Sequence, residues 1–290
     1  MEINLNLILI SAAIGGIIRL FQFLYTSEYF KMGDPRNWKG HSSEFKNRVS
    51  NLFGIVPHTV IWEGSKPKPN QKILFVANHQ VGALELPLIW SVIWLQTGIW
   101  PRGLMDRLHF VFPIWSHILW FMGGILGSRE TCEQAMTEGY PIFVLPGGGD
   151  EVMRSKYCKK YELLWKDRKG FAVMASAHDY TIVPVSSIGV EDMMTILMDI
   201  PVGWFLKFTG DKRVSQTVPL ICPNFSFQRQ YIKFGKPIKT AKGDDTQDIR
   251  DKAFAAVSSG IKELQEKQST DPKRYYNIFT FFFKDHKKED

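Results

Sequence analysis

Residues 74–87 read LFVANHQVGALELP, and the predicted fold is built outward from this stretch. Its first four residues are apolar and predict a buried strand, while the apolar run Leu86–Leu95 is long enough for a helix. His79 therefore lies where a strand passes into a helix. At the edge of a parallel sheet, that position commonly presents reactive groups.

The stretch also places a carboxylate, Glu85, six positions after His79. A neutral imidazole can take a proton from a hydroxyl group near pH 7, and a carboxylate on its other nitrogen would fix the tautomer and stabilise the imidazolium. Taken alone, the two residues fit better a core histidine bound to backbone and a glutamate on a solvated helix face. Other segments are needed to decide between these interpretations.

A second strand, predicted over Tyr140–Leu145, ends in the glycine-rich sequence PGGGDE at residues 146–151. Consecutive glycines permit positive φ and close approach of the backbone. After a strand, such a segment can present N–H groups to an oxyanion or a phosphate, although it can also be only a turn. It is not a P-loop, because no Gly-Lys-Ser/Thr sequence follows it.

Predicted strands and helices alternate between residues 58 and 238, which indicates an α/β domain with a mixed, partly parallel sheet flanked by helices. Further strands are predicted over His58–Trp62, Thr181–Ser187 and Gln230–Phe234, and further helices over Glu44–Phe53, Thr131–Met136, Phe171–His178 and Ile249–Gln268. The apolar segment 86–127 predicts helices divided by prolines, either a buried pair or a face for an acyl chain. Met193–Phe208 is also apolar and predicts a second membrane-facing element.

An apolar run from Ile3 to Ile18 is followed by Arg19 and the largely apolar residues 20–25, and together they are long enough to span a bilayer. They predict an N-terminal membrane-anchoring helix, with a core helix as the alternative. The charges that follow lean basic, so the positive-inside rule places the remainder in the cytosol.

The net charge of +7 is compatible with nucleic acid, an anionic membrane or a phosphorylated substrate as the partner. No zinc-finger spacing and no RNA-binding aromatic signature accompanies the charge, which argues against nucleic acid. Basic residues concentrate between positions 154 and 169, either as a solvated run or as contacts to anionic head groups: Arg154, Lys156, Lys159, Lys160, Lys166, Arg168 and Lys169. The three cysteines, Cys132, Cys158 and Cys222, show no metal-binding spacing and predict reduced thiols.

Four segments, in this order, resemble the motifs of the glycerolipid acyltransferase (lysophospholipid acyltransferase) superfamily. They are Asn78-His79 with a following acid, Gly123 to Arg129, the glycine-rich segment 146–151, and Ile182-Val183-Pro184-Val185. The usual motif places the acid five residues after the histidine. The later acid here and the Pro-Gly-Gly sequence resemble the branch that includes type-2 diacylglycerol acyltransferases and phytyl ester synthases. The resemblance covers roughly residues 70–240 and none of the first 25.

The resemblance implies a membrane-associated O-acyltransferase that moves a fatty acyl group from acyl-CoA to the hydroxyl of a glycerolipid. His79 would be the general base and Glu85 its orienting partner. The implied substrate-binding residues are Asn78, Arg129, Gly147, Gly148, Gly149 and Glu151, and no metal or cofactor is implied beyond acyl-CoA as co-substrate. Asp150 stands where relatives with a phosphate-bearing acceptor have arginine, so a neutral acceptor such as diacylglycerol or monoacylglycerol is expected.

The expected division is a membrane anchor at 1–25, a helical and linker part at 26–70, an acyltransferase domain at 71–270, and an interfacial aromatic segment with a charged tail at 271–290. The expected location is the endoplasmic reticulum membrane, with the catalytic domain facing the cytosol. A lysophospholipid acyltransferase and an inactive lipid-binding scaffold of the same fold are the alternatives. A serine hydrolase is excluded, because the chain has no Gly-x-Ser-x-Gly sequence.

Overall fold

The computed structural model describes residues 40–106, 109, 113–202 and 217–276. Its strands are β1 (His58–Trp62), β2 (Ile73–Ala77), β3 (Arg102–Met105), β4 (Gly124–Leu126), β5 (Ile142–Val144), β6 (Thr181–Ile188), β7 (Met194–Pro201), β8 (Thr217–Pro223) and β9 (Gln230–Phe234). Its α-helices are α2 (Ser43–Gly54), α3 (Leu86–Thr97), α4 (Pro113–Phe121), α5 (Arg129–Thr137), α6 (Gly148–Val152), α7 (Gly170–His178) and α9 (Thr246–Thr270). Two short 3₁₀ turns are η3 (Val81–Ala83) and η5 (Glu191–Met193).

Seven of the described strands form one sheet in the order β1-β9-β6-β2-β5-β3-β4, and β7 and β8 form a separate hairpin. Neighbouring strands of the large sheet are parallel, except for the antiparallel pair β6 and β9. The expected α/β fold with a mixed, partly parallel sheet is therefore confirmed.

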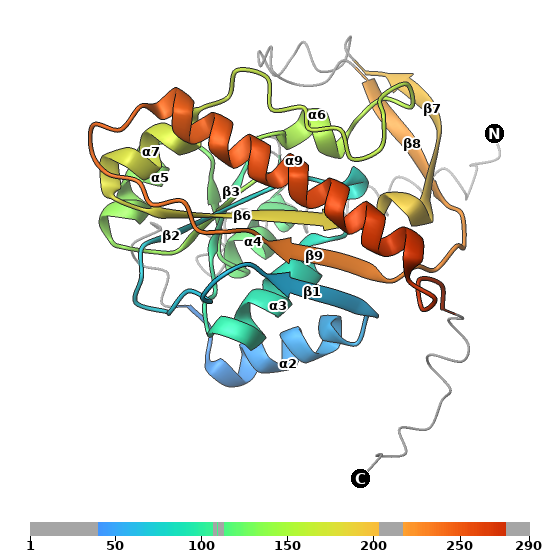
Figure 1. Cartoon of the computed structure of the whole chain (residues 1–290), viewed down its shortest axis with the longest axis horizontal. Helices are drawn as coiled ribbons and strands as arrows, with labels where there is room; N and C mark the ends of the chain where they lie inside the picture. The colour runs from blue at the N-terminus through green and yellow to red at the C-terminus, as the bar shows by residue number, and fades with distance from the viewer. Residues whose placement is uncertain (1–39, 107–108, 110–112, 203–216, 277–290) are drawn as a thin grey trace, which may run out of the picture.

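Helices cover both faces of the sheet (Figure 1). On one face α9, α7 and α5 contribute buried apolar side chains such as Val257 and Ala172 to a common core. On the other face α3 contributes Leu88 and Ile93, and α2 packs against α3 from outside. The helices predicted at 44–53, 131–136, 171–178 and 249–268 all fall within these elements.

All five residues of the central strand β2 are buried. A parallel strand with helices over both faces must be apolar on both sides, which explains why its sequence is a continuous apolar run without alternation. The strand is paired with β6 on one side and β5 on the other. Its position therefore fixes the residues that follow it, Asn78 and His79, near the middle of the sheet edge.

The segment 86–127 departs from the all-helical expectation, because the chain forms β3 and β4 between its helices. The two strands pair in parallel, and β3 also pairs with β5. Glycine is needed in β4, because a Cβ on Gly124 would lie 2.8 Å from the backbone carbonyl oxygen of Leu119 in α4. Met193–Phe208 likewise contains a strand in its described part, β7, which pairs with β8.

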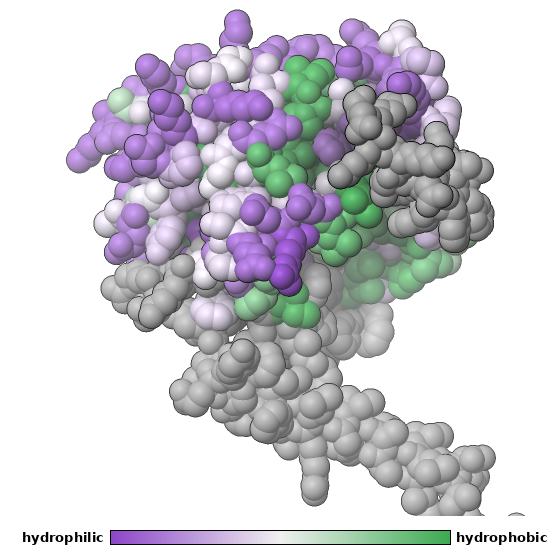
Figure 2. Space-filling model, turned by 90° about the horizontal axis from the view of Figure 1, so that it is seen from below, coloured by the Kyte–Doolittle hydropathy of each residue, from purple (hydrophilic) through white to green (hydrophobic). Residues whose placement is uncertain are grey.

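Within the described part of the chain, no helix combines the length and the apolar character needed to cross a bilayer. The anchor predicted for residues 1–25 lies outside that part, as does most of the tail predicted at 271–290. Apolar residues do reach the surface on the α2 and α3 side, where Leu52 and Leu95 are exposed. Seen from below, apolar residues gather there between hydrophilic regions (Figure 2).

Candidate active site

Three adjacent parallel strands, β6, β2 and β5, bring three of the sequence motifs to one edge of the sheet. β2 leads directly into Asn78 and His79, and β5 leads into the glycine-rich segment 146–151. β6 contains the fourth motif and runs on toward Glu191. Motifs that lie far apart in the sequence are thus neighbours in space, as expected at the carboxyl ends of parallel strands.

His79 and Glu85 form a buried pair. The Nδ1 atom of His79 lies 2.6 Å from Oε1 of Glu85, and the same oxygen accepts a hydrogen bond of 3.0 Å from the backbone N–H of Gln80. His79 is 8% exposed and Glu85 is 2% exposed. With Glu85 ionised, Nδ1 must carry the proton, because a carboxylate only accepts. The other ring nitrogen, Nε2, then keeps its lone pair for a substrate proton.

A tight turn between the two residues explains why the longer spacing still allows contact. Gly82 and Ala83 both adopt positive φ, at 77° and 61°. These left-handed residues lie within η3 and fold the chain back before Glu85. A left-handed alanine costs about 1–2 kcal/mol, so the surrounding contacts must hold it in place. The carboxylate therefore reaches the imidazole although five residues lie between them, one more than in the usual motif.

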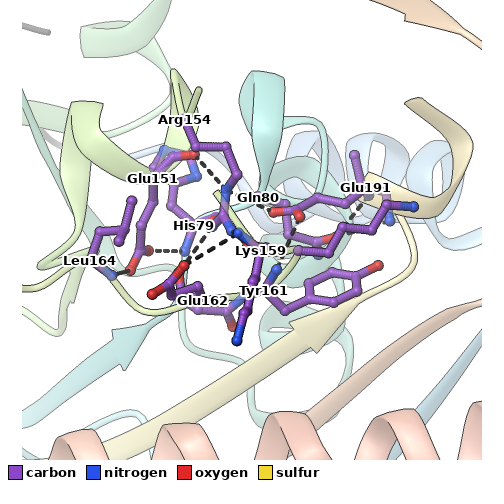
Figure 3. Close-up of polar contacts among 12 residues, drawn as sticks. His79, Gln80, Glu151, Arg154, Lys159, Tyr161, Glu162, Leu164 and Glu191 are labelled. Atoms are coloured by element: carbon purple, nitrogen blue, oxygen red, sulfur yellow. Dashed lines mark hydrogen bonds and ion pairs between the residues drawn. The ribbon is translucent and has the colours of Figure 1, made fainter. Parts of the chain in front are cut away.

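The backbone of His79 is held by two side chains, Glu151 at the end of the glycine-rich segment and Arg154 just after it (Figure 3). The N–H of His79 donates to Oε2 of Glu151 at 2.7 Å, and the carbonyl of His79 accepts from Arg154 at 3.5 Å. The other oxygen of Glu151 accepts from the N–H of Leu164 at 2.8 Å. Burial raises the pKa of Glu151, and these two N–H groups and the charge of Arg154 act against that shift.

A second buried contact ties this arrangement to the end of β6. Arg154 pairs with Glu191 at 3.3 Å, and both side chains are almost completely buried. Burial raises the pKa of Glu191 to about 7, although Arg154 opposes the shift. Gln80, next to the histidine, accepts hydrogen bonds from the N–H groups of Val190 and Glu191 (Figure 3). The segments around His79, Glu151 and Glu191 therefore form one hydrogen-bonded frame.

The glycine-rich segment is shaped by close contact and by an ion-pair cluster. A Cβ on Gly147 would lie 1.9 Å from Cδ of Glu151, so only glycine fits there. The N–H of Gly148 donates to the carbonyl of Leu145 at 3.0 Å, which commits one of the N–H groups considered for an oxyanion. Asp150 pairs with Lys166 at 2.9 Å and with Arg168. Its charge is thus compensated, which weakens the argument that it repels a phosphate.

Two of the residues expected to bind substrate have other partners in this structure. The side-chain amide of Asn78 is buried and exchanges two hydrogen bonds with the backbone of Ser187 on β6, at 3.0 and 2.8 Å. Arg129 is exposed at the start of α5 and lies 3.5 Å from Glu133. The strand that precedes Arg129, β4, is three strand spacings from β2, or roughly 14 Å. Substrate contact by either residue stays a prediction.

Three residues associated with the histidine could not be singled out from the sequence. Arg154 stood in a basic run predicted to be solvated or to meet head groups, yet it is 3% exposed and donates to the carbonyls of Lys159 and Glu162. Glu191 is its buried partner. The pKa of His109 is lowered, first by burial and in small part by His79, which places the two imidazoles near each other. Among the described residues, no group of acidic, histidine and cysteine side chains is placed to hold a metal ion.

This arrangement is suited to general-base chemistry. A histidine with one nitrogen fixed by a carboxylate can take a proton from a hydroxyl group through the other. Its backbone is anchored at both the N–H and the carbonyl, which limits movement of the ring. Such anchoring is what a group needs if it is to be held in a reactive geometry.

Comparison with known proteins agrees with this chemistry. Residues 59–188 match the family described as Acyltransferase. A mouse protein named "DGAT1/2-independent enzyme synthesizing storage lipids" is 26% identical over 140 residues, 47% of this chain and 42% of that protein. Diacylglycerol O-acyltransferase 2B of Umbelopsis ramanniana is 28% identical over 232 residues, 73% of this chain and 62% of that protein. The chain thus spans less than two thirds of the length of either relative.

The fold also resembles a solved structure, the crystal structure of the 1-acyl-sn-glycerophosphate (LPA) acyltransferase, PlsC, from Thermotoga maritima. The TM-score is 0.50 at 17% identity, with 77% of this chain and 79% of that chain covered. At this identity the likeness concerns the fold alone. Residues 59–188, which match the family model, contain the His79–Glu85 pair, the glycine-rich segment and Arg154, and Glu191 follows just after them. By sequence, residues 59–188 of this chain are therefore similar to the family described as Acyltransferase.

Proposed function

We propose that this protein is a membrane-associated O-acyltransferase that moves a fatty acyl group from acyl-CoA to the hydroxyl of a neutral glycerolipid, a diacylglycerol or a monoacylglycerol. The observation that carries the proposal is the 2.6 Å contact between Nδ1 of His79 and Glu85 in a largely buried site. The match of residues 59–188 to the family described as Acyltransferase supports the reaction type. The acyl donor, the acceptor and the membrane location are parts of the proposal.

In the proposed mechanism, Nε2 of His79 takes the proton of the acceptor hydroxyl as its oxygen attacks the thioester carbonyl. The tetrahedral intermediate then collapses, the carbon–sulfur bond breaks, and the imidazolium of His79 gives the proton to the departing coenzyme A sulfur, which restores the neutral base. Glu85 stabilises the imidazolium while it exists. Hydrogen-bond donors must face the oxyanion. In this conformation the N–H of Gly148 is already bonded to Leu145, so it is not one of them.

A neutral acceptor is supported by the cations beside the glycine-rich segment. Lys166 and Arg168 are both paired with Asp150, so neither can hold a phosphate without giving up its carboxylate. Arg168 also donates to the backbone carbonyl of Pro146, at 2.9 Å. The names of two relatives, a storage-lipid enzyme and a diacylglycerol acyltransferase, also support a neutral acceptor.

The test uses the full chain in membranes from cells that lack neutral lipid synthesis, with labelled acyl-CoA and either diacylglycerol or lysophosphatidic acid. We expect faster acylation of diacylglycerol, and loss of product with His79→Ala. Faster acylation of lysophosphatidic acid would support a lysophospholipid acyltransferase instead. Lipid binding without turnover that depends on His79 would support an inactive scaffold.

A further inference from the structure

The hairpin of β7 and β8 has two unlike faces. Its register pairs Met198 with Leu220 and Ile200 with Val218, and the bulge after Ile196 shifts the phase of β7 by one residue. Paired residues share a face and successive residues alternate. These two pairs therefore lie on one face, and Asp199 lies on the other. In Figure 1 the hairpin stands apart from the large sheet, at the upper right.

The inner face rests against the candidate active site. Asp199 accepts hydrogen bonds from the hydroxyl of Ser155 and from the N–H of Lys156. Cδ1 of Ile221 lies 3.9 Å from the position that a Cβ on Gly82 would occupy. The hairpin therefore touches the turn that joins His79 to Glu85.

The outer face is apolar and exposed. Met198 is 50% exposed and Leu220 is 42% exposed, and the bulged Leu197 is 55% exposed. Between them, the two described strands contain only one charged residue, Asp199, which points inward. Contiguous exposed apolar surface of this kind marks an interaction site.

Residues next to the hairpin indicate what covers this face. Lys156, held to Asp199 through its backbone, is exposed and lies 5.1 Å from the ring of Tyr157, which is 83% exposed. Lys159 and Lys160 follow and are also exposed. An apolar face bordered by lysines and an exposed tyrosine has the chemistry of a lipid interface, with the apolar side chains below the head groups and the cations among them.

We propose that the outer face of the β7–β8 hairpin lies in the surface of an anionic lipid layer, with Lys156 and Tyr157 at the level of the head groups. Because the inner face touches Gly82, this contact holds the mouth of the active site at the lipid surface. The inference rests on the proposed function only in that the acceptor is a membrane lipid.

Cys222 makes a local test possible, because it is exposed and its place in the register puts it on the outer face. In the full chain, Cys158→Ser leaves Cys222 as the exposed site for an environment-sensitive dye. The labelled protein is mixed with phosphatidylcholine–phosphatidylserine vesicles whose acyl chains carry bromine, which quenches a dye that enters the lipid. The control protein also carries Cys222→Ser and Leu52→Cys, so that the dye is attached at position 52 in α2, where the native side chain is 62% exposed. We expect quenching by the vesicles at position 222 and less at position 52. No quenching at 222, or protection there by a second protein copy without lipid, overturns the proposal.

Activity gives the second readout. The double variant Met198→Asp, Ile200→Asp is compared with Leu52→Asp, using an acceptor embedded in vesicles and a short-chain acceptor dissolved as monomers. Transfer of one such side chain from water to lipid changes a binding constant by roughly tenfold. The turnover of the double variant on vesicles should therefore fall at least tenfold. Its turnover on the soluble acceptor should be unchanged. Equal turnover of both variants on vesicles contradicts the proposal. If no acceptor is acylated by the unaltered chain, the proposed function fails, and the quenching result alone decides this inference.

Discussion

His79 is held at three points by three different side chains. Its Nδ1 contacts Glu85, its N–H donates to Glu151, and its carbonyl accepts from Arg154. The first contact sets the tautomer, and the other two fix the backbone that carries the ring. Loss of a backbone contact should therefore alter the position of the base without altering its chemistry.

Substitution of the pair should separate the roles of its two members. We expect His79→Ala to remove nearly all turnover, since general-base catalysis contributes about 10²–10⁴-fold. Glu85→Gln should lose less, because it still orients the ring but stabilises the imidazolium poorly, and Glu85→Asp should fall between wild type and Glu85→Gln. Affinity for acyl-CoA should stay nearly constant, and thermal unfolding would check each fold. Wild-type kcat in Glu85→Gln would show that Glu85 is not the partner.

Glu191 should give the folded state a pH dependence of its own. Its pKa is raised from 4.5 to about 7, so between those values the folded state holds a proton that the unfolded state has released. The free energy of unfolding then falls as pH rises from 4.5 to 7, by at most about 3 kcal/mol. We expect Glu191→Gln to flatten the fall, as measured by urea unfolding across this range. An identical slope in both proteins would refute the assignment.

At the scale of elements, the glycine-rich segment and α6 act as a support for the strand end at His79. Gly147 has φ of −66°, which any residue can adopt, so its need for glycine comes from contact with Glu151. Gly170, at the start of α7, has no atom within 4 Å of an added Cβ. The two glycines therefore form a matched pair for substitution.

Gly147→Ala should displace the carboxylate of Glu151 and so release the N–H of His79. Overpacking of this kind typically costs about 1–3 kcal/mol of stability, and we expect a loss of kcat with it. Gly170→Ala should change neither quantity by much. Urea unfolding and initial rates provide the measurement. Similar behaviour of the two variants would mean that the contact with Glu151 is unimportant.

The same elements show how far the sequence could predict the fold and the site. The continuous apolar run of β2 and the order of the motifs were sufficient to predict strands β2, β5 and β6, and the resemblance to a known family predicted the His79–Glu85 pair. β3 and β4 were missed, because short apolar strands cannot be told from buried helix by periodicity. Arg154 was missed because a charge run does not reveal which member turns inward. Arg154 turns inward because it pairs with Glu191, and the position of Glu191 depends on the tertiary fold.

For the whole molecule, the N-terminal segment is expected to add a membrane contact. Within residues 1–25, an apolar run extends to Arg19 and largely apolar residues continue to Tyr25. This segment lies outside the described part of the chain. We expect deletion of these residues to increase the protein released from membranes by carbonate extraction. The dye at Cys222 should still be quenched by vesicles, because the hairpin is retained. Complete extraction of the full-length chain would contradict the anchor.

The sheet order has a consequence for how the chain is made and divided. β1, which ends at Trp62, is paired with β9, which begins at Gln230, and Trp62 stacks on Phe234 with ring centroids 3.8 Å apart. During synthesis β1 must wait unpaired until almost the whole chain has emerged, and such long-range pairing makes folding slow. A fragment that stops at residue 188, where the family match ends, would contain every motif but would lack β9. Both β1 and the side of β6 that pairs with β9 would then have no strand partner. The smallest piece in which β1 and β6 keep their strand partners must therefore include β9, a strand that carries none of the four motifs.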